Sequence, residues 1–301
     1  MGGEVPVHGD SLPPARTTPA AKPPYGLEPP LAVPKLAANV SLLFPQLDFL
    51  DRFAAAAGAG FSRVEYQFPY AWRASEVGER VRAAGLEVVL HNLPAGDLAA
   101  GDRGIACLPE RRGEFRDGVG RALEYARAAG CGRLNCLAGV VPSDAPRARH
   151  FDTLVENLRF AADALRGEGM QLMLEACNTR SVPGFFISTS RDAIAALDAA
   201  GADNAYFQYD IFHMQIMEGD LARTIETLLP RIGHMQLADV PGRHEPGTGE
   251  INFTFLLTHI DRIGYAGAVG CEYNPVGDTL QGLTWAKPYL SSTSTPAAGA
   301  R

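Results

Sequence analysis

The sequence contains no C-x-x-C pair, although five cysteines are present, at positions 107, 131, 136, 177 and 271. An odd number of cysteines without paired spacing does not suit the disulfide framework of a secreted domain. We therefore expect reduced thiols and a cytoplasmic protein.

Long apolar runs and basic blocks are also missing. No run reaches the roughly 18 apolar residues that a membrane-spanning helix needs. The formal net charge is −7 and the sequence pI is about 5.5, without a cluster of lysine or arginine. This balance argues against nucleic acid or an anionic membrane surface as a partner. A small anionic substrate stays compatible, because a site can be locally positive on an acidic protein.

The two ends of the chain differ in composition from the rest. Residues 1–35 carry nine prolines and no apolar core of a secretory signal, so we expect a disordered, proline-rich extension. The tail "SSTSTPAAGAR", residues 291–301, is expected to be disordered as well. The folded unit is then 36–290, and the 46% hydrophobic content of the chain is enough for a large core.

One pattern recurs along this unit: an alanine-rich amphipathic segment ends in glycine, and a short apolar strand follows. Glycine is favoured just past a helix C-terminus because it enters the left-handed region without a Cβ penalty. Seven such junctions, with an opening strand in "KLAANVSLLF", predict eight strands. The junctions are "AAAAGAGFSRVEYQF", "VRAAGLEVVLHNL", "ARAAGCGRLNCLAG", "LRGEGMQLMLEAC", "DAAGADNAYFQYD", "LPRIGHMQLAD" and "IDRIGYAGAVGCEY".

Eight β/α units in residues 36–290 match a (β/α)8 barrel, or TIM barrel, in number and length. Each predicted strand is followed by a helix-like segment, apart from a loop-rich stretch after the third. A doubly wound open sheet is the alternative. That fold usually has a glycine-rich phosphate turn after its first strand, and "NVSLLFPQ" contains no glycine. We therefore predict a single barrel.

Polar side chains gather where the predicted strands end, which is where the chemistry of such barrels takes place. The ends read "VVLHN", "LMLE", "FQYDIFH", "HMQLAD" and "GCE", and they contain His91, Glu175, Asp210, His213, Gln236 and Glu272. Any one of these could be a capping or salt-bridged residue, but five strand ends together favour a site. Because side chains alternate along a strand, Cys271 should face the helices while Glu272 faces the barrel mouth.

Burying several carboxylates is costly unless they are paired or bind a cation. Glu175, Asp210, Gln236 and Glu272 would supply three carboxylates and one amide oxygen. Such an oxygen-rich set suits Mg²⁺ or Mn²⁺ rather than a structural zinc. We predict a divalent metal at these residues, with Glu272 as a metal ligand, a catalytic base, or both.

At these residues the sequence resembles the hydroxypyruvate isomerase family, within the xylose isomerase-like barrels. The resemblance covers nearly the whole folded unit. It is carried by "ANVSLLFPQLDFLDRFAAAAGAGF", "HNLPAGDLAAGDRGIACLPER", "EFRDGVGRALEYARAAGC", "VENLRFAAD", "QYDIFHMQIMEGDL", "HEPGTGEINF" and "VGCEYNP".

The resemblance implies interconversion of hydroxypyruvate and 2-hydroxy-3-oxopropanoate (tartronate semialdehyde). Glu175 and Glu272 match the two glutamates that shuttle protons in the family. Related sugar epimerases bind metal through a Glu, Asp, His, Glu set, and Gln236 stands where many of them have histidine. A second departure is "EACN", where family members read "EPIN". Asn178 is retained there, and Cys177 is either a small filler or a residue near the site.

The expected reaction moves a carbonyl from C2 to C3 through an enediolate, whose charge needs electrophilic stabilisation. His91 and His213 are candidates to hydrogen-bond substrate oxygens, with structural histidines as the alternative. Arg103 and Arg243 are candidates to hold the substrate carboxylate, because arginine binds carboxylates bidentately. The loop at 244–251 is expected to be a lid or an oligomer contact, so a homo-oligomer stays open.

Several other functions compete with this one. A 2-oxo-tetronate isomerase acts on a substrate one carbon longer; that group lacks the histidine of "HNLPAGD", which is His91 here, so hydroxypyruvate is favoured. A ketose 3-epimerase would use the same two glutamates. A nuclease of the endonuclease IV kind would need more histidines and a basic face. A non-catalytic barrel would have lost one of Glu175, Asp210 or Glu272.

Overall fold

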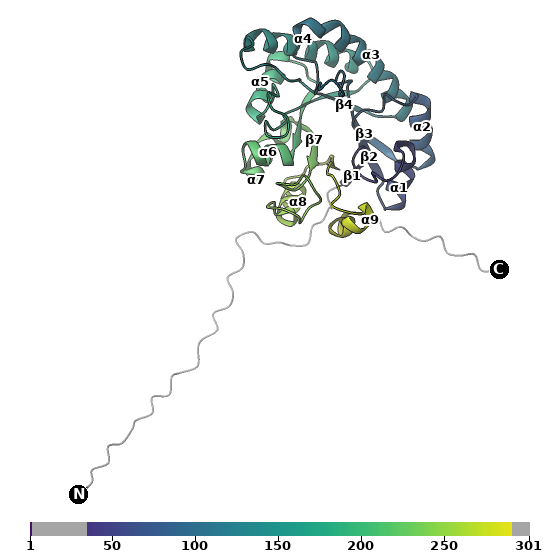
Figure 1. Ribbon diagram of the computed structural model, residues 1–301, viewed down its shortest axis with the longest axis vertical. Helices are drawn as coiled ribbons and strands as arrows, with labels where there is room; N and C mark the ends of the chain where they lie inside the picture. The colour runs from purple at the N-terminus through teal and green to yellow at the C-terminus, as the bar shows by residue number, and fades with distance from the viewer. Residues whose placement is uncertain (2–34, 291–301) are drawn as a thin grey trace, which may run out of the picture. The chain divides into compact units, whose positions relative to one another are not determined.

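The computed structural model describes Met1 and residues 35–290, and residues 35–290 form a closed barrel of eight parallel strands (Figure 1). Each strand pairs with the next, and β1 closes the barrel on β8 with Leu36 opposite Val269. The (β/α)8 prediction is confirmed, and the open-sheet alternative is wrong. The strands are β1 (Lys35–Asn39), β2 (Arg63–Tyr66), β3 (Glu87–Asn92), β4 (Arg133–Cys136), β5 (Gln171–Glu175), β6 (Ala205–Asp210), β7 (Ile232–Leu237) and β8 (Ala268–Cys271).

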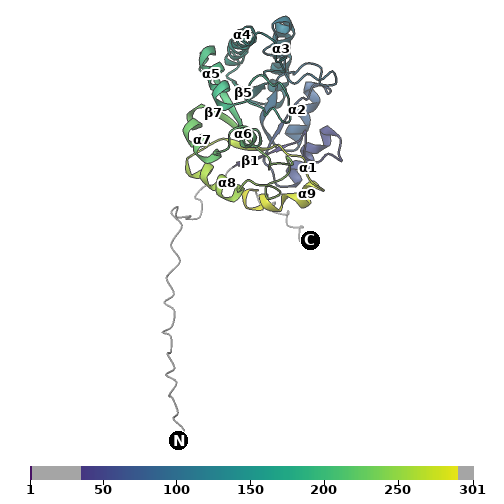
Figure 2. The same cartoon turned by 60° about the vertical axis from the view of Figure 1, so that its left-hand side comes forward.

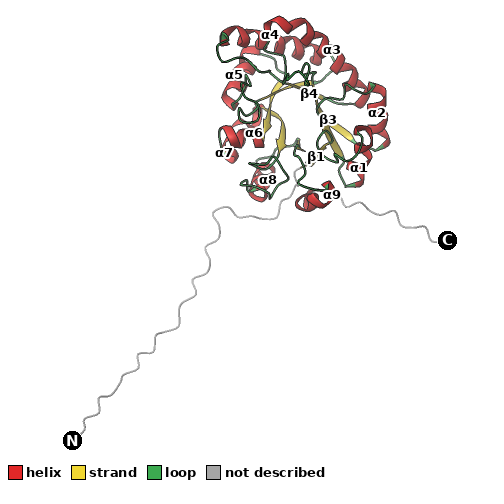
Figure 3. Ribbon diagram, viewed as in Figure 1, coloured by secondary structure: helices red, strands yellow, loops and turns green. Residues whose placement is uncertain are grey.

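Helices surround the barrel on its outside (Figures 2 and 3). None of those in the described part of the chain is long and apolar enough to cross a bilayer. The predicted disordered segments lie outside the described residues, apart from Met1 and Lys35. The helices are η1 (Phe49–Asp51), α1 (Arg52–Gly58), α2 (Ala74–Ala83), η2 (Pro109–Arg111), α3 (Arg112–Ala129), α4 (Arg147–Arg166), α5 (Ser190–Ala200), α6 (Ile211–Met217), α7 (Leu221–Leu228), η3 (Leu229–Arg231), α8 (Phe253–Arg262), α9 (Thr279–Gly282) and η4 (Leu283–Tyr289).

Helix α5 shows how local signals in the sequence set the ends of a helix. The Thr189 side chain accepts a hydrogen bond from the Asp192 backbone N–H and caps the first turn. At the other end Gly201 adopts φ 66°, and its N–H donates to the Leu197 carbonyl. The buried face between them is spaced at three and four residues: Ala193, Ala196, Leu197 and Ala200.

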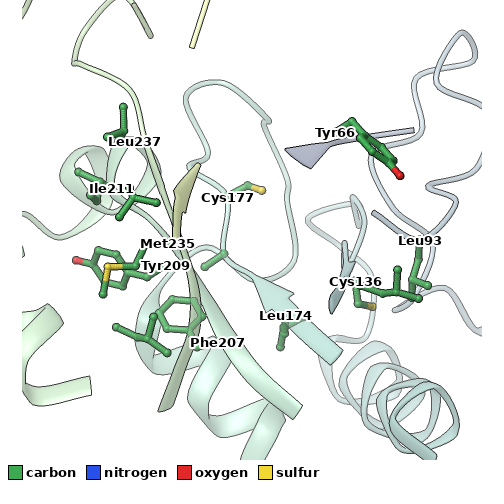
Figure 4. Packing of buried hydrophobic residues seen from close by; sticks show 14 of the residues in the cluster. Tyr66, Leu93, Cys136, Leu174, Cys177, Phe207, Tyr209, Ile211, Met235 and Leu237 are labelled. Carbon is green, nitrogen blue, oxygen red and sulfur yellow. The ribbon is translucent and has the colours of Figure 1, made fainter. Parts of the chain in front are cut away.

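Each strand presents two different faces. The outer faces pack against the helices and form the large apolar core, to which Leu174, Phe207 and Met235 belong (Figure 4). Burying one such side chain contributes about 1.5–3 kcal/mol. Cys271 lies in this outer core, as predicted. The inner faces are apolar only in a small cluster around Met173, and they become polar toward the C-terminal ends of the strands.

One predicted helix–glycine junction is wrong. Gly233 of "LPRIG" does not follow a helix end. The helical segment already ends with η3 at Arg231, and Gly233 is the second residue of β7. A Cβ at Gly233 would come within 2.7 Å of both the Met173 sulfur and the Tyr206 Cβ. Glycine is therefore needed here for close packing inside the barrel, not for a left-handed turn.

Candidate active site

A cavity of about 400 Å³ lies at the C-terminal ends of the strands. Its walls combine polar side chains from the strand ends with both apolar and polar side chains from the loops. Among the predicted site residues, Glu175, Glu272, His213, Arg103 and Arg243 line this cavity. The full lining is Gln67, Phe68, Asn92, Leu98, Arg103, Leu137, Glu175, Cys177, Ser181, Val182, Phe185, His213, Arg243 and Glu272.

Glu272 follows directly after β8, and both of its oxygens are held. Gln67 Nε2 donates to Oε1 at 2.6 Å, and Arg243 donates to Oε2 at 2.9 Å. Burial raises the pKa of Glu272 to about 8; Arg243 opposes this shift and the charge of Asp210 adds to it. The carboxyl group is therefore poised to exchange a proton near neutral pH.

Glu175 ends β5 and is held on one side only. Its Oε2 accepts hydrogen bonds from Asn135 Nδ2 at 2.7 Å and from Gln208 Nε2 at 3.2 Å. Burial and then the charges of Glu272 and Asp210 raise the pKa of Glu175 well above its ordinary value. Since Oε2 is occupied, Oε1 is the oxygen of Glu175 that is left for a ligand.

Asp210 ends β6 and has one satisfied and one unsatisfied oxygen. Its Oδ1 accepts the backbone N–H of Phe212 at 2.8 Å and so caps α6. Its Oδ2 is buried and has no hydrogen-bond partner. Oxygens of Glu175, Asp210 and Glu272 all lie within 4.8 Å of one another. Three converging carboxylates with an orphaned buried oxygen fit a hard divalent cation.

Gln236, the predicted fourth ligand, lies deeper in the barrel with its amide already engaged. Its oxygen accepts from Gln208 Nε2 at 2.6 Å, and its Nε2 donates to Glu65 at 2.8 Å. Glu65 also accepts from His234 Nε2 at 2.6 Å and from Asn39 Nδ2 at 2.9 Å. Gln236 thus connects a buried polar network to the site from below.

His213 lies at the start of α6 and is buried beside two of the carboxylates. Its Nε2 is 3.5 Å from Asp210 Oδ2 and 3.8 Å from Glu175 Oε1. Burial lowers the pKa of His213 to about 4, although the charge of Asp210 works in the other direction. The ring is therefore neutral at physiological pH, so these two contacts are not ion pairs.

Arg243 reaches the carboxylates from the loop after β7. Its guanidinium is 2.9 Å from Glu272 and 3.7 Å from Asp210, and it lies over the Phe212 ring at 5.1 Å from the centroid. Burial lowers the pKa of Arg243, and the charges of Glu272 and Asp210 more than offset this, so the pKa is raised overall. A permanent cation therefore already faces part of the carboxylate cluster.

The loop that carries Arg243 is organised by one buried carboxylate, Asp239. Its two oxygens accept the backbone N–H groups of Val240, Gly247, Gly249 and Ile251 at 2.9–3.1 Å. The predicted lid or oligomer contact at 244–251 is thus tied down at three points. A role of this loop in closure or assembly stays a prediction.

Arg103 lies at the rim of the cavity, on the long loop after β3. Its guanidinium donates only to backbone carbonyls, at Leu98 (3.2 Å) and Asp102 (2.6 Å), among the contacts of the described residues. The side chain is exposed. Its charge is therefore available to an anion that enters the cavity.

His91 does not lie with the other predicted substrate-binding residues. Its ring stacks on Tyr66 at 5.6 Å between centroids, in the layer between strands and helices. The pairing of β2 with β3 shifts between Val64 and Glu65, so β3 contains one extra residue. Such a bulge reverses the face to which the following side chains point. Asn92, and not His91, is among the residues that line the cavity; a contact of His91 with substrate stays a prediction.

Several residues of the site escaped the sequence-based prediction. Gln67, Asn92, Asn135 and Gln208 hold the two glutamates directly or through one another. The sequence contains a pattern that could have predicted them, since polar residues recur at alternate positions, as in Glu65 and Gln67. An alternation of polar residues within an otherwise apolar strand marks an inward-facing polar stripe. Cys177, left open between filler and site residue, lines the cavity.

Comparison with known proteins agrees with this geometry. The family model described as Xylose isomerase-like TIM barrel matches residues 53–289. Hydroxypyruvate isomerase of Escherichia coli is 48% identical over 255 residues, which cover 85% of this chain and 99% of that protein. 2-oxo-tetronate isomerase of Cupriavidus necator is 47% identical over 258 residues, covering 86% and 99%.

Solved structures show the same relationship. The crystal structure titled AP endonuclease, family 2, from Brucella melitensis matches with a TM-score of 0.84 at 43% identity, covering 86% of this chain and all of that chain. A D-psicose 3-epimerase of Clostridium cellulolyticum shares the fold, with a TM-score of 0.66 at 19% identity, covering 82% of this chain and 87% of that chain. On the family match and the relatives above 40% identity, the chain belongs to the xylose isomerase-like TIM barrel family.

Proposed function

We propose that the protein is a hydroxypyruvate isomerase, which interconverts hydroxypyruvate and 2-hydroxy-3-oxopropanoate. The observation that carries the proposal is the pair of buried carboxyl groups, Glu175 and Glu272, at one cavity with oxygens within 4.8 Å. The 48% identical relative named hydroxypyruvate isomerase, matched over nearly its whole length, supports it.

The two glutamates suit a proton transfer between neighbouring carbons. A base must take a proton from C3, next to the ketone, and an acid must return one at C2. Burial raises the pKa of both carboxyl groups above the ordinary value of a glutamate. Each can therefore take or return a proton more readily near neutral pH, and the two can exchange the roles of base and acid. Glu175 Oε1, without a protein hydrogen bond among the described contacts, is the oxygen we assign to proton removal.

The negative charge of the enediolate needs stabilisation, and three features supply it in the proposal. The neutral ring of His213 can donate a hydrogen bond, and Arg243 supplies a fixed positive charge beside Glu272. A divalent cation, Mg²⁺ or Mn²⁺, would be held by Glu175, Asp210 and Glu272 and would act as a Lewis acid on the substrate oxygens. Gln236 could join them only by giving up its bond from Gln208.

The substrate carboxylate is assigned to Arg103. Arg243, the other predicted anchor, is already engaged by Glu272 at 2.9 Å and Asp210 at 3.7 Å. Arg103 makes no hydrogen bond or close ion pair with a carboxylate among the described contacts, and it lines the same cavity. We expect the 2-oxo acid to lie with its carboxylate at the rim and its carbonyl toward His213 and the glutamates.

A 2-oxo-tetronate isomerase is the second candidate. A relative with this name is 47% identical, and the cavity of about 400 Å³ has room for a chain one carbon longer. In the sequence, His91 favoured hydroxypyruvate over the longer acid. Its ring is not among the groups that line the cavity, so it does not distinguish the two substrates by direct contact. The choice between the two substrates therefore rests on an assay.

A nucleic-acid substrate is the less favoured choice, although a 43% identical structure is titled AP endonuclease. The net charge of −7 and a cavity with only Arg103 and Arg243 as cations do not suit a phosphate backbone. We propose a small 2-oxo acid as the ligand. The five free thiols of the chain fit a reducing compartment such as the cytoplasm.

The test follows product formation by NMR, with hydroxypyruvate and with 2-oxo-tetronates as substrates. Each assay is run with EDTA and then with Mg²⁺ or Mn²⁺ restored. Glu175→Gln and Glu272→Gln should each lower kcat by at least about 10²-fold, while the exposed Glu79→Gln should not. Preference for the four-carbon acid would mean that a 2-oxo-tetronate is the substrate, while the proposed proton transfer would stay the same. No turnover of either acid by folded protein would overturn the proposal.

A further inference from the structure

Asn178 and His213 form an unusual pair beside the catalytic carboxylates. The backbone N–H of Asn178 donates to His213 Nδ1 at 3.1 Å, and Asn178 Nδ2 lies 2.6 Å from the same Nδ1. The side-chain amide cannot be turned round without loss, because its Oδ1 accepts the N–H of Ser181 at 2.7 Å. Both residues are buried, so water does not compete for these bonds.

Two donors therefore point at one ring nitrogen. In a neutral imidazole one nitrogen carries the proton and the other offers a lone pair. A proton on Nδ1 would face two N–H groups and leave all three donors without an acceptor, which is costly in a buried site. The lone pair must be on Nδ1, so the proton is on Nε2.

We propose that Asn178 is a positioning residue, which fixes His213 as the neutral tautomer that presents its Nε2–H to the substrate. The inference rests on the proposed function for the identity of that substrate, but not for the state of the ring. It gives His213 the role of hydrogen-bond donor to the carbonyl oxygen, where negative charge develops in the enediolate.

The surroundings of Nε2 agree with this role. Two carboxylate oxygens lie near it, Asp210 Oδ2 at 3.5 Å and Glu175 Oε1 at 3.8 Å, and no hydrogen bond joins either to the ring among the described contacts. His213 lines the cavity. An N–H group held near two acceptors but bonded to neither is free for a ligand oxygen.

The same geometry decides between two metal positions. Glu175, Cys177 and His213 also place ligand atoms within 4.8 Å of one another. A histidine that binds metal through Nε2 normally donates its Nδ1–H to an acceptor. Asn178 offers only donors there. We therefore assign the cation to Glu175, Asp210 and Glu272 and keep His213 for the substrate.

A purely structural role for Asn178 is the competing explanation, since its side chain also closes the turn to Ser181. Two variants separate the explanations. Asn178→Asp keeps the oxygen that accepts from Ser181 but replaces the Nδ2 donor with a second acceptor, which draws a proton to Nδ1. Asn178→Ala loses the turn bond, yet the backbone N–H still donates to Nδ1.

The experiment reads the ring directly by ¹⁵N NMR of histidine-labelled protein, without substrate, with His213→Gln to assign the signals among the seven histidines. In the unchanged protein the proton should be on Nε2. Asn178→Asp should move a proton to Nδ1 and lower kcat on hydroxypyruvate by at least about 10²-fold, as expected for a wrong tautomer. Asn178→Ala should keep the tautomer and lose mainly stability.

A matched control is Asn204→Asp, which also removes amide donor bonds, to the Ala162 and Met170 carbonyls. It should leave the His213 signals unchanged. A proton on Nδ1 in the unchanged protein, or an unaltered ring in Asn178→Asp, would overturn the inference. If the ring behaves as expected but no 2-oxo acid is turned over, only the proposed function fails.

Discussion

Asp210 has two roles that single substitutions can separate. Its Oδ1 caps α6, and its Oδ2 lies beside the other carboxylates without a hydrogen-bond partner among the described residues. Asp210→Asn keeps an oxygen for the cap and removes the charge, whereas Asp210→Ala removes both. We expect both variants to lose Mn²⁺ affinity by more than the roughly 10–100-fold typical of an outer-shell change. Only the alanine variant should also lose about 1 kcal/mol of stability.

Calorimetric titration with Mn²⁺ and urea denaturation with EDTA measure the two effects. The asparagine variant should be at least as stable as the unchanged protein without metal, because it removes a buried charge whose Oδ2 has no hydrogen-bond partner in the described part of the chain. Retained Mn²⁺ affinity in Asp210→Asn would show that the cation does not bind at this carboxylate.

Glu272 makes a prediction for the pH dependence of stability. Its pKa is raised from 4.5 to about 8, mainly by burial. Between these values the unfolded chain has lost the proton that the folded protein keeps, so folding takes up a proton and becomes less favourable as pH rises. Glu272→Gln has no such proton. Its stability relative to the unchanged protein should therefore increase with pH, by at most about 1.4 kcal/mol per pH unit.

Urea denaturation in EDTA at several pH values between 4.5 and 8 tests this, with the exposed Glu79→Gln as control. Saturating Mn²⁺ should remove the pH dependence of this stability difference, because a bound cation keeps the carboxylate ionised in the folded state as well. Parallel stability curves for Glu272→Gln and the unchanged protein in EDTA would contradict a raised pKa.

At the scale of single elements, the loop after β7 depends on Asp239. Four backbone N–H groups converge on its carboxylate, and the Asp239 carbonyl accepts the N–H of Arg243 at 2.9 Å. Asp239→Asn places an NH₂ group against some of these donors. We expect a loss of about 2–4 kcal/mol, because hydrogen bonds to a buried charge are among the stronger ones. A displaced Arg243 should also lower kcat, because its charge is assigned to the enediolate.

Hydrogen exchange at the amides of 247, 249 and 251 should accelerate in this variant, alongside a lower urea midpoint. Asp278→Asn is the matched control, because Asp278 caps α9 at the surface through one bond from the Gln281 N–H, and asparagine caps almost as well. Equal, small effects at both positions would show that the loop is held by its other contacts.

The strands show which parts of the site a sequence can predict. Seven glycine-containing junctions and an opening strand predicted the eight β/α units, although one of those glycines lies inside β7. The last residues of β5 and β6 correctly predicted Glu175 and Asp210 as neighbours. The predicted direction of the His91 side chain was wrong. A one-residue bulge in the pairing of β2 with β3 reverses the face of the side chains that follow it in β3. Nothing in "LEVVLHN" signals that bulge, which depends on how two strands pair.

Hydrogen bonds between strands that are distant in the sequence are the second feature of the site that the sequence does not predict. Gln236 was predicted as a ligand from its place in β7, but Glu65 of β2, 171 residues away, takes up its amide. Such a contact depends on closure of the barrel, and spacing along the chain does not contain it. The hydrogen bonds from Asn178 to His213 also depend on the folded barrel, since they join the segment after β5 to the segment after β6.

At the scale of the whole barrel, a buried polar network crosses the interior beneath the cavity. Asn39, His234 and Gln236 all donate to Glu65, and through Gln236 and Gln208 the network reaches Glu175. It therefore joins β1, β2, β5, β6 and β7. The chain keeps no side chain on the facing position of β8, where Gly270 lies against the Glu65 carboxylate.

This contact makes a prediction about two distant positions. A Cβ on Gly270 would come within 2.2 Å of Glu65 Oε2, so Gly270→Ala should push the carboxylate out of its network and cost several kcal/mol, on the order of a broken buried ion pair. Glu65→Ala should cost as much by itself. In the double variant the clash is gone, so the two losses should be clearly less than additive.

Urea denaturation of the single and double variants measures the coupling. Gly113→Ala in α3 is the matched control, because nothing lies within 4 Å of its Cβ position, and alanine there should stabilise by up to about 1 kcal/mol. The network also predicts an effect on function: Glu65→Ala frees Gln236 and Gln208, so Glu175 loses part of its orientation and kcat should fall with KM less changed. Additive stability losses would mean that β8 yields to the new methyl group, and that the carboxylate of Glu65 is not what requires glycine at 270.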